Sequence, residues 1–204
     1  MIYQLDAVAE GVFAPLVACW RAMRREGERL PDRAALTPAR LGPILDYVHF
    51  LEWVDPPDDI RYRVSGAAEL ARLGSASLGE NYIDHLDEHA ADYCRRWLHR
   101  LNSHPCGTLI ASEEYGRDGR VRMTRYLTLP MLCGERGRLQ VMSQVDTREE
   151  VGVFGPEVMC ALSWRDRLTE LTPVDLGFGV PAGFEPFAPA EPLSAATGSA
   201  AAPP

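Results

Sequence analysis

Two histidines in the segment His85-Leu86-Asp87-Glu88-His89 have a spacing that could support metal chemistry. At positions i and i+4 of a helix both imidazoles lie on one face, where they can hold a metal ion. The segment lacks the His-Glu-x-x-His pattern, and no third ligand is evident. Its acidic residues also suit the first turn of a helix, where they complement the helix dipole. A metal-assisted enzyme that uses His85 and His89 is therefore the lesser functional alternative.

Two arginines, Arg63 and Arg125, lie inside otherwise apolar predicted strands. A charge in such a place needs a partner, because burying an unpaired charge is costly. The favoured partner is an acid of the same chain on the outer face of the sheet. The alternative is an anionic ligand or a carboxylate of another protein. The adjacent acids Glu113 and Glu114 are expected to be solvated at a strand end rather than to act as an acid–base pair.

The elements that position these residues follow from hydrophobic periodicity. Apolar residues recur at helical spacing over residues 8–26, and a second helix, capped by Asp84 or Asp87, runs from about residue 88 to Ser103. Asp118-Gly119 is a hairpin-turn signal between two later strands. The predicted strands are residues 46–54, 60–65, 107–115, 120–131 and 138–146.

The C-terminal part of the chain is harder to interpret. Leu162, Arg165 and Leu168–Leu171 allow a short helix that Pro173 would end. From Val180 onward the sequence is mostly Pro, Ala, Gly and Ser, which cannot bury enough apolar surface to become ordered. We therefore predict an extension of uncertain structure over 149–179 and a disordered tail over 180–204.

The composition excludes several classes of protein. The chain has 204 residues, 46% of them apolar, and a net charge of -8, which argues against a nucleic-acid-binding protein. All 21 basic residues are Arg, which we attribute to coding bias. The five cysteines show no Cys-x-x-Cys spacing, as expected for reduced thiols in the cytoplasm. The N-terminus does not look like a signal peptide, and no apolar run approaches the roughly 20 residues of a membrane helix.

The order of two strands, a helical middle and three strands resembles the PAS-like domains that stand alone in bacteria. A Leu-Pro-x-Arg segment, a Pro-led helix, a Tyr-Arg-x-x-Gly strand and a late strand that ends in Leu-Pro carry the resemblance, which covers roughly residues 15 to 148. It implies an α+β fold with a five-stranded antiparallel sheet, helices on one face and an N-terminal flanking helix. The matching residues are Trp20, Arg24, Leu30, Pro31, Arg33, Pro38, Leu45, Tyr62, Arg63, Gly66, Gly79 and the segment Arg125–Met131.

The resemblance also implies a division of the chain and a place for a ligand. The flanking helix would occupy residues 1–30 and pack on the other sheet face or on a second copy, and the PAS-like domain would occupy 31–148. The ligand would lie between the inner sheet face and the central helix. The facing of Ile110 and Leu127 is uncertain, since a register slip of one residue would turn them outward. The expected pocket residues are Tyr62, Val64, Trp97, Leu98, Leu101, Ile110, Arg125 and Leu127.

The expected function is non-enzymatic: a cytoplasmic sensory or docking domain that binds a small molecule or a signalling partner, with a possible homodimer through the N-terminal helix. An alternative is an interaction module with a filled core and no ligand. The cofactor remains unknown. PAS-like domains that bind haem use a histidine of the central helix, but His99 lies beside the apolar stripe, and no Cys follows Asn81 as flavin photochemistry would require. No nucleic-acid or membrane partner is expected.

Overall fold

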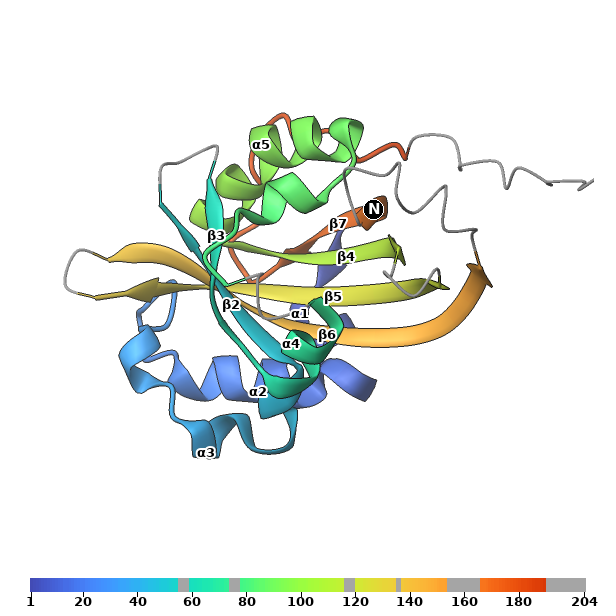
Figure 1. Cartoon of the computed structure of the whole chain (residues 1–204). Helices are drawn as coiled ribbons and strands as arrows, with labels where there is room; N and C mark the ends of the chain where they lie inside the picture. The colour runs from blue at the N-terminus through green and yellow to red at the C-terminus, as the bar shows by residue number, and fades with distance from the viewer. Residues whose placement is uncertain (55–58, 74–77, 116–119, 135–136, 154–165, 190–204) are drawn as a thin grey trace, which may run out of the picture.

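The computed structural model describes residues 1–54, 59–73, 78–115, 120–134, 137–153 and 166–189. One twisted sheet runs through the molecule, and helices cover both of its faces (Figure 1). The strands are β1 (Tyr3–Gln4), β2 (Val48–Trp53), β3 (Ile60–Ser65), β4 (Cys106–Tyr115), β5 (Arg120–Cys133), β6 (Arg138–Val153) and β7 (Asp166–Asp175). The helices are α1 (Leu5–Val8), α2 (Ala14–Met23), α3 (Pro38–Leu41), α4 (Ala67–Leu73) and α5 (Glu88–Ser103), with 3₁₀ turns η1 (Gly11–Phe13), η2 (Arg33–Ala35), η3 (Gly42–Tyr47) and η5 (Tyr82–His85).

The expected five-stranded antiparallel sheet is wrong. The sheet has seven strands in the order β1-β7-β4-β5-β6-β2-β3, and β1 pairs with β7 in parallel. The five predicted strands all form and pair antiparallel, and β2 joins the first pair to the later three strands through β6. The sheet extends beyond them because β7 pairs with the free edge of β4. Helices cover both faces, with α5 on one face and α2, the expected flanking helix, on the other.

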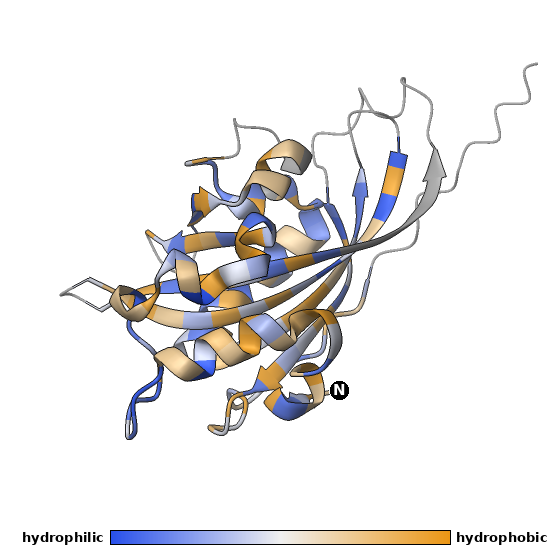
Figure 2. Cartoon of the chain, turned by 90° about the horizontal axis from the view of Figure 1, so that it is seen from below, coloured by the Kyte–Doolittle hydropathy of each residue, from blue (hydrophilic) through white to orange (hydrophobic). Residues whose placement is uncertain are grey.

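The first face of the sheet packs against α5. The helix begins after Asp87, whose side chain accepts a hydrogen bond from the backbone N–H of Ala90 at 3.0 Å. Its apolar stripe, with Cys94 and Leu101 fully buried, lies on inward-facing residues of the strands. Figure 2 shows hydrophobic and hydrophilic residues alternating along the strands, as expected for a sheet with residues on two faces.

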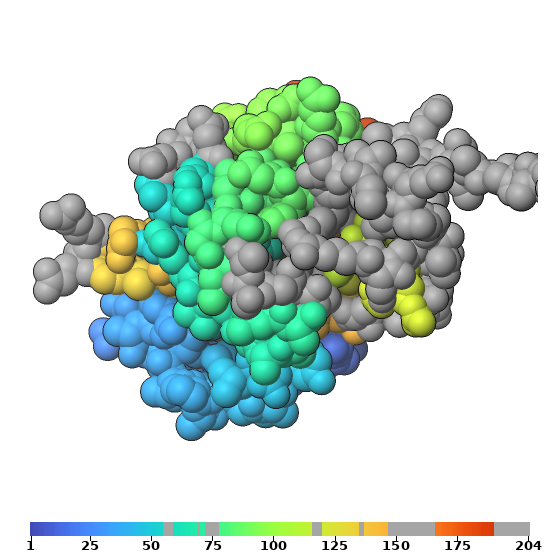
Figure 3. Space-filling model, viewed as in Figure 1, coloured from blue at the N-terminus to red at the C-terminus, as the bar shows by residue number. Residues whose placement is uncertain are grey.

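The second face packs against α2, so the N-terminal segment is part of the same structure. Trp20 is fully buried, and its indole N–H donates to the carbonyl oxygen of Pro130 in β5 at 2.7 Å. The stripe that was expected to cover either the sheet or a second copy therefore covers the chain's own sheet. The helix is shorter than the predicted 8–26 because Gly11 has a positive φ of 66° and Pro15 lies in the first turn of α2. The two layers lie on opposite sides of the molecule (Figure 3).

The predicted short helix before Pro173 is also wrong, because residues 166–175 form β7. The spacing of Leu168 and Leu171 had suggested a helix. The register between β7 and β4 shifts between Ala111 and Ser112, which marks a β-bulge in β7. Because of this bulge, Leu168 and Leu171 face the same core although they are three positions apart. Periodicity over so short a segment could not distinguish a bulged strand from a helical turn.

The predicted start of the disordered tail at residue 180 is wrong as well. Val180, Phe184 and Phe187 are half-buried against the core under α5. Residues 190–204 lie outside the described residues, as does the Asp118-Gly119 turn.

No helix in the described part of the chain has the length and apolar character needed to cross a membrane.

Candidate functional site

A row of polar side chains crosses the buried face of the sheet beneath α5. Thr108 in β4 is the register partner of Thr128 in β5, which pairs with Ser143 in β6, which pairs with His49 in β2. All four are buried. Partners in register project from the same face of a sheet, so the four side chains form one line across four strands. A polar line in a hydrophobic core needs an explanation, because burying polar groups is unfavourable unless they are hydrogen-bonded.

The row lines a small cavity between the sheet and α5. Its volume is about 20 Å³, enough for a molecule about the size of water. Asn102 reaches it from α5, together with Leu98 of the apolar stripe. The cavity is lined by His49, Leu51, Ile60, Tyr82, Leu98, Asn102, Thr108, Ile110, Tyr126, Thr128, Val141 and Ser143.

The polar groups around the cavity differ in how well they are satisfied. The hydroxyls of Thr128 and Ser143 are 3.2 Å apart and share one hydrogen bond. The Asn102 amide donates to the carbonyl oxygen of Cys106 at 3.4 Å, a long hydrogen bond. Thr108 is 0% exposed, and its hydroxyl has no hydrogen-bond partner among the described residues. A hydroxyl left this way costs about 1–3 kcal/mol, so the Thr108 end of the row is the part most ready to accept a ligand.

A second polar chain starts at the cavity and follows β4 and β5. The Thr124 hydroxyl donates to the phenol oxygen of Tyr126 at 3.2 Å, and Ser112 lies 3.1 Å from the Thr124 hydroxyl oxygen. Ser112 and Thr124 are register partners and are both buried. The face under α5 is therefore polar along two directions, across the strands and along them.

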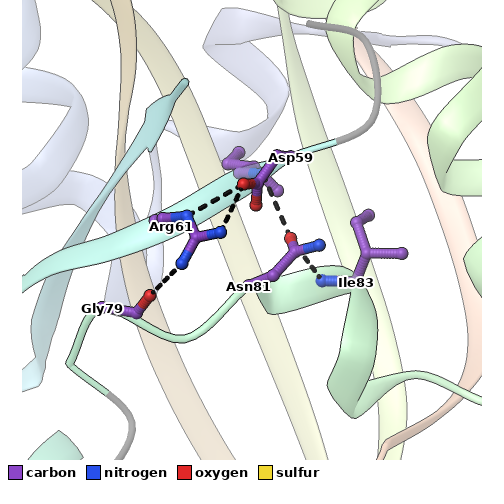
Figure 4. A network of polar contacts seen from close by, with 6 residues as sticks. Asp59, Arg61, Gly79, Asn81 and Ile83 are labelled. Carbon is purple, nitrogen blue, oxygen red and sulfur yellow. Dashed lines mark hydrogen bonds and ion pairs between the residues drawn. The ribbon is translucent and has the colours of Figure 1, made fainter. Parts of the chain in front are cut away.

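Tyr82 closes the side of the cavity near β3, and a local polar network holds it there. Asn81 accepts hydrogen bonds from the backbone N–H groups of Ile60 at 3.1 Å and Ile83 at 3.3 Å (Figure 4). Arg61 binds Asp59 at 2.8 Å and donates to the carbonyl oxygen of Gly79 at 2.9 Å (Figure 4). These contacts fasten residues 79–83 to the edge of β3.

Burial keeps the Tyr82 phenol, in the wall of the cavity, uncharged. Burial raises the pKa of Tyr82 well above its ordinary value, and the neighbouring Cys94, Asp166, Tyr62 and Tyr126 raise it further. The Tyr82 phenol therefore stays neutral at physiological pH. The residues that line the cavity include no Asp, Glu, Lys or Arg.

Five of the eight expected pocket residues lie on the α5 side of the sheet. Leu98 and Ile110 line the cavity directly. Tyr62, Trp97 and Leu101 belong to the surrounding core, and the Tyr62 ring lies 5.4 Å from the His49 ring in an edge-to-face contact.

The other three are misplaced, for two physical reasons. Val64 is 48% exposed because of a bulge in β3. Phe50 pairs with Val64 but the next residue, Leu51, pairs with Tyr62, so β3 has one extra residue between the two pairs. Val64 therefore faces the side of the sheet opposite to Tyr62. Leu127 belongs to the core under α2, since the neighbouring Tyr126 faces α5 and adjacent strand residues face opposite sides. Arg125 is two residues from Leu127 in the same strand, so it faces the same side as Leu127 and does not line the cavity.

The two histidines weighed as metal ligands have different partners. His85 ends the turn η5 and lies 3.1 Å from a carboxylate oxygen of Glu80, whereas the Nε2 atom of His89, in α5, lies 2.7 Å from the carbonyl oxygen of Ala188. The two histidines are on separate elements because the chain leaves the helical conformation at Leu86. The described residues contain no group of three His, Cys, Asp or Glu side chains placed to hold a metal ion.

Two other residues considered from the sequence also lie away from the cavity. His99 makes an edge-to-face contact with Trp53 at 5.1 Å, and burial lowers its pKa. Arg63 pairs with Glu52 of β2 at 2.7 Å, the internal ion pair favoured from its sequence context. Neither residue lines the cavity.

The sequence did contain a signal for the residues that were missed. Thr124, Tyr126 and Thr128 occupy every second position of β5, and Thr108 and Ser112 lie on one side of β4. Polar residues at every second position normally indicate a solvated face. Only the cover provided by α5 makes this polar face an internal one.

Comparisons with family models, with curated proteins and with solved structures find no match to this chain.

Proposed function

We propose that this protein is a small-molecule sensor whose ligand binds between α5 and the sheet. The observation that carries the proposal is the buried polar row, with the hydroxyl of Thr108 at the cavity and without a hydrogen-bond partner in the part of the chain that the structure describes. An apolar core would be more stable with apolar residues at these positions, so a polar row retained there points to a requirement other than folding.

The proposed ligand is an uncharged molecule with hydrogen-bonding groups. The lining offers hydroxyl, amide, phenol and imidazole groups and includes no Asp, Glu, Lys or Arg. The cavity as it stands holds a molecule about the size of water, so a larger ligand must move α5 outward. The alternative of an anionic ligand held by Arg125 does not apply to this cavity, because Arg125 does not line it.

The proposal assigns no reaction to the site. Burial raises the pKa of Cys106 to about 12, and burial also raises the pKa of Cys94, so both thiols stay protonated and are poor nucleophiles. Free, buried cysteines also suit a reducing compartment, which supports a cytoplasmic location.

Mass spectrometry of molecules released from natively purified protein tests the proposal. We expect wild-type protein to release a neutral compound that a Ser143→Leu variant, whose larger side chain fills the cavity, does not retain. A Val64→Leu variant is the matched control, because Val64 is exposed and lies away from the cavity. If wild-type and Ser143→Leu proteins are both folded and release the same molecules, the cavity is not the binding site.

A docking module without a ligand is the second candidate. The volume of only about 20 Å³ favours it, since a core this well filled resembles that of a protein with no internal ligand. Leu45, Tyr47 and Val64 are apolar and exposed. Failure to recover any ligand, together with loss of partner binding in a Tyr47→Ala variant, would favour docking.

A further inference from the structure

Residues 180–189, here called the C-terminal strap, run along the outer flank of α5 and antiparallel to it. His104, after the end of α5, contacts the carbonyl oxygen of Phe178 at 3.1 Å, just before the strap begins. His89, in the first turn of α5, contacts the carbonyl oxygen of Ala188 near the end of the strap. Figure 1 shows this red segment beside the green helix. The strap thus follows nearly the whole length of α5.

The strap is held by two aromatic side chains and by main-chain carbonyl groups. The ring of Phe184 packs edge-to-face on Trp97 with centroids 5.1 Å apart, and the ring of Phe187 packs on Tyr93 at 5.0 Å. The Tyr93 hydroxyl donates to the carbonyl oxygen of Glu185 at 2.6 Å. Phe184 and Phe187 are three residues apart in the strap, and their partners Trp97 and Tyr93 are four residues apart in α5, so the two rings pack about one helical turn from each other.

These contacts are those of a bound peptide rather than of a strand or helix. The strap forms no regular secondary structure, and Phe184 and Phe187 remain half-buried. Extended peptides are commonly recognised by pockets for alternate side chains and by hydrogen bonds to their main chain. Tyr93 and Trp97 are 5% and 4% exposed with the strap in place, so its departure would uncover an aromatic surface.

We propose that this flank of α5 is a peptide-docking surface that the chain occupies with its own strap. The partner is an extended segment of another protein with two phenylalanines three residues apart, which takes the place of Phe184 and Phe187. The stretch before the strap is held in place, because Asp175 Oδ1 accepts hydrogen bonds from the backbone N–H groups of Gly177, Phe178 and Gly179 at 2.8–2.9 Å, so only residues 180–189 would leave. Neither Tyr93 nor Trp97 lines the cavity, so the proposal does not depend on a ligand there.

A full-length Phe184→Ala/Phe187→Ala variant tests the proposal with a labelled synthetic peptide of the strap sequence, Val-Pro-Ala-Gly-Phe-Glu-Pro-Phe-Ala-Pro. Fluorescence anisotropy measures its binding. We expect the variant to bind the peptide at least about tenfold more tightly than wild type, whose own strap competes for the surface. The same peptide with both phenylalanines replaced by alanine should not bind.

The control variant is Val12→Ala, which shortens an exposed apolar side chain on the α2 side of the molecule and should bind the peptide no better than wild type. If the double variant unfolds cooperatively but does not bind the peptide, the surface does not act as a docking site. If it loses cooperative unfolding, the strap is an integral part of the core, which overturns the proposal equally.

Discussion

Replacing Thr108 by valine should stabilise the ligand-free protein. The substitution exchanges a hydroxyl for a methyl group of nearly the same shape in a fully buried side chain. The hydroxyl has no partner among the described residues, so its removal ends a desolvation cost without breaking a hydrogen bond. Both residues are β-branched and suit a strand. We expect a gain of about 1 kcal/mol in the free energy of unfolding, or about 2–4 °C in Tm for a chain of this length.

Urea denaturation and thermal melting of refolded, ligand-free protein measure the change. Thr128→Val is the matched control, because its hydroxyl bonds with that of Ser143 at 3.2 Å. That variant leaves the buried Ser143 hydroxyl without this bond and should lose about 1 kcal/mol. A Thr108→Val variant that is less stable than wild type would show that the hydroxyl is satisfied in solution, and the argument for a ligand-ready group at Thr108 would then be wrong.

Two further predictions concern the framework around the site. Asn81→Ala should lower stability by about 1 kcal/mol, because it removes the acceptor for the N–H groups of Ile60 and Ile83; an unchanged urea midpoint would contradict this role. Arg167 forms a bidentate ion pair with Glu113, with both N–O distances 2.9 Å, and this pair lowers the pKa of Glu113. The pair therefore stabilises the folded protein at pH values above the unfolded pKa of Glu113. This contribution is lost as the pH falls through the lower pKa of the folded state. Arg167→Met should remove that part of the acid dependence, and stability curves from about pH 7 to pH 3 that retain the wild-type slope would refute it.

The sequence predicted elements with strong local signals. The helix that ends at Ser103 has a continuous apolar stripe and a capping Asp87, and the structure places it at Glu88–Ser103. The strand Ile60–Ser65 has the predicted bounds. Such signals arise from hydrogen bonds and side-chain periodicity within one segment, so they are visible without any knowledge of the rest of the chain.

The tertiary structure decided which face each residue occupies and what covers it. Val64 faces the unexpected side of β3, and Leu168 and Leu171 face one core from a bulged strand rather than from a helix, because a bulge depends on the partner strand as well as on the strand's own sequence. Phe184 and Phe187 became ordered because α5 offers them aromatic partners, which their local composition did not indicate.

The polar row shows the same division between sequence and structure. Thr108 and Thr128 could be assigned to strands from their neighbours, but their alignment depends on the register between β4 and β5. Their burial depends on α5, which is supplied by a separate stretch of sequence. The amino-acid sequence by itself therefore determined most of the local elements, whereas the candidate site arose only when pairing and packing brought distant residues together.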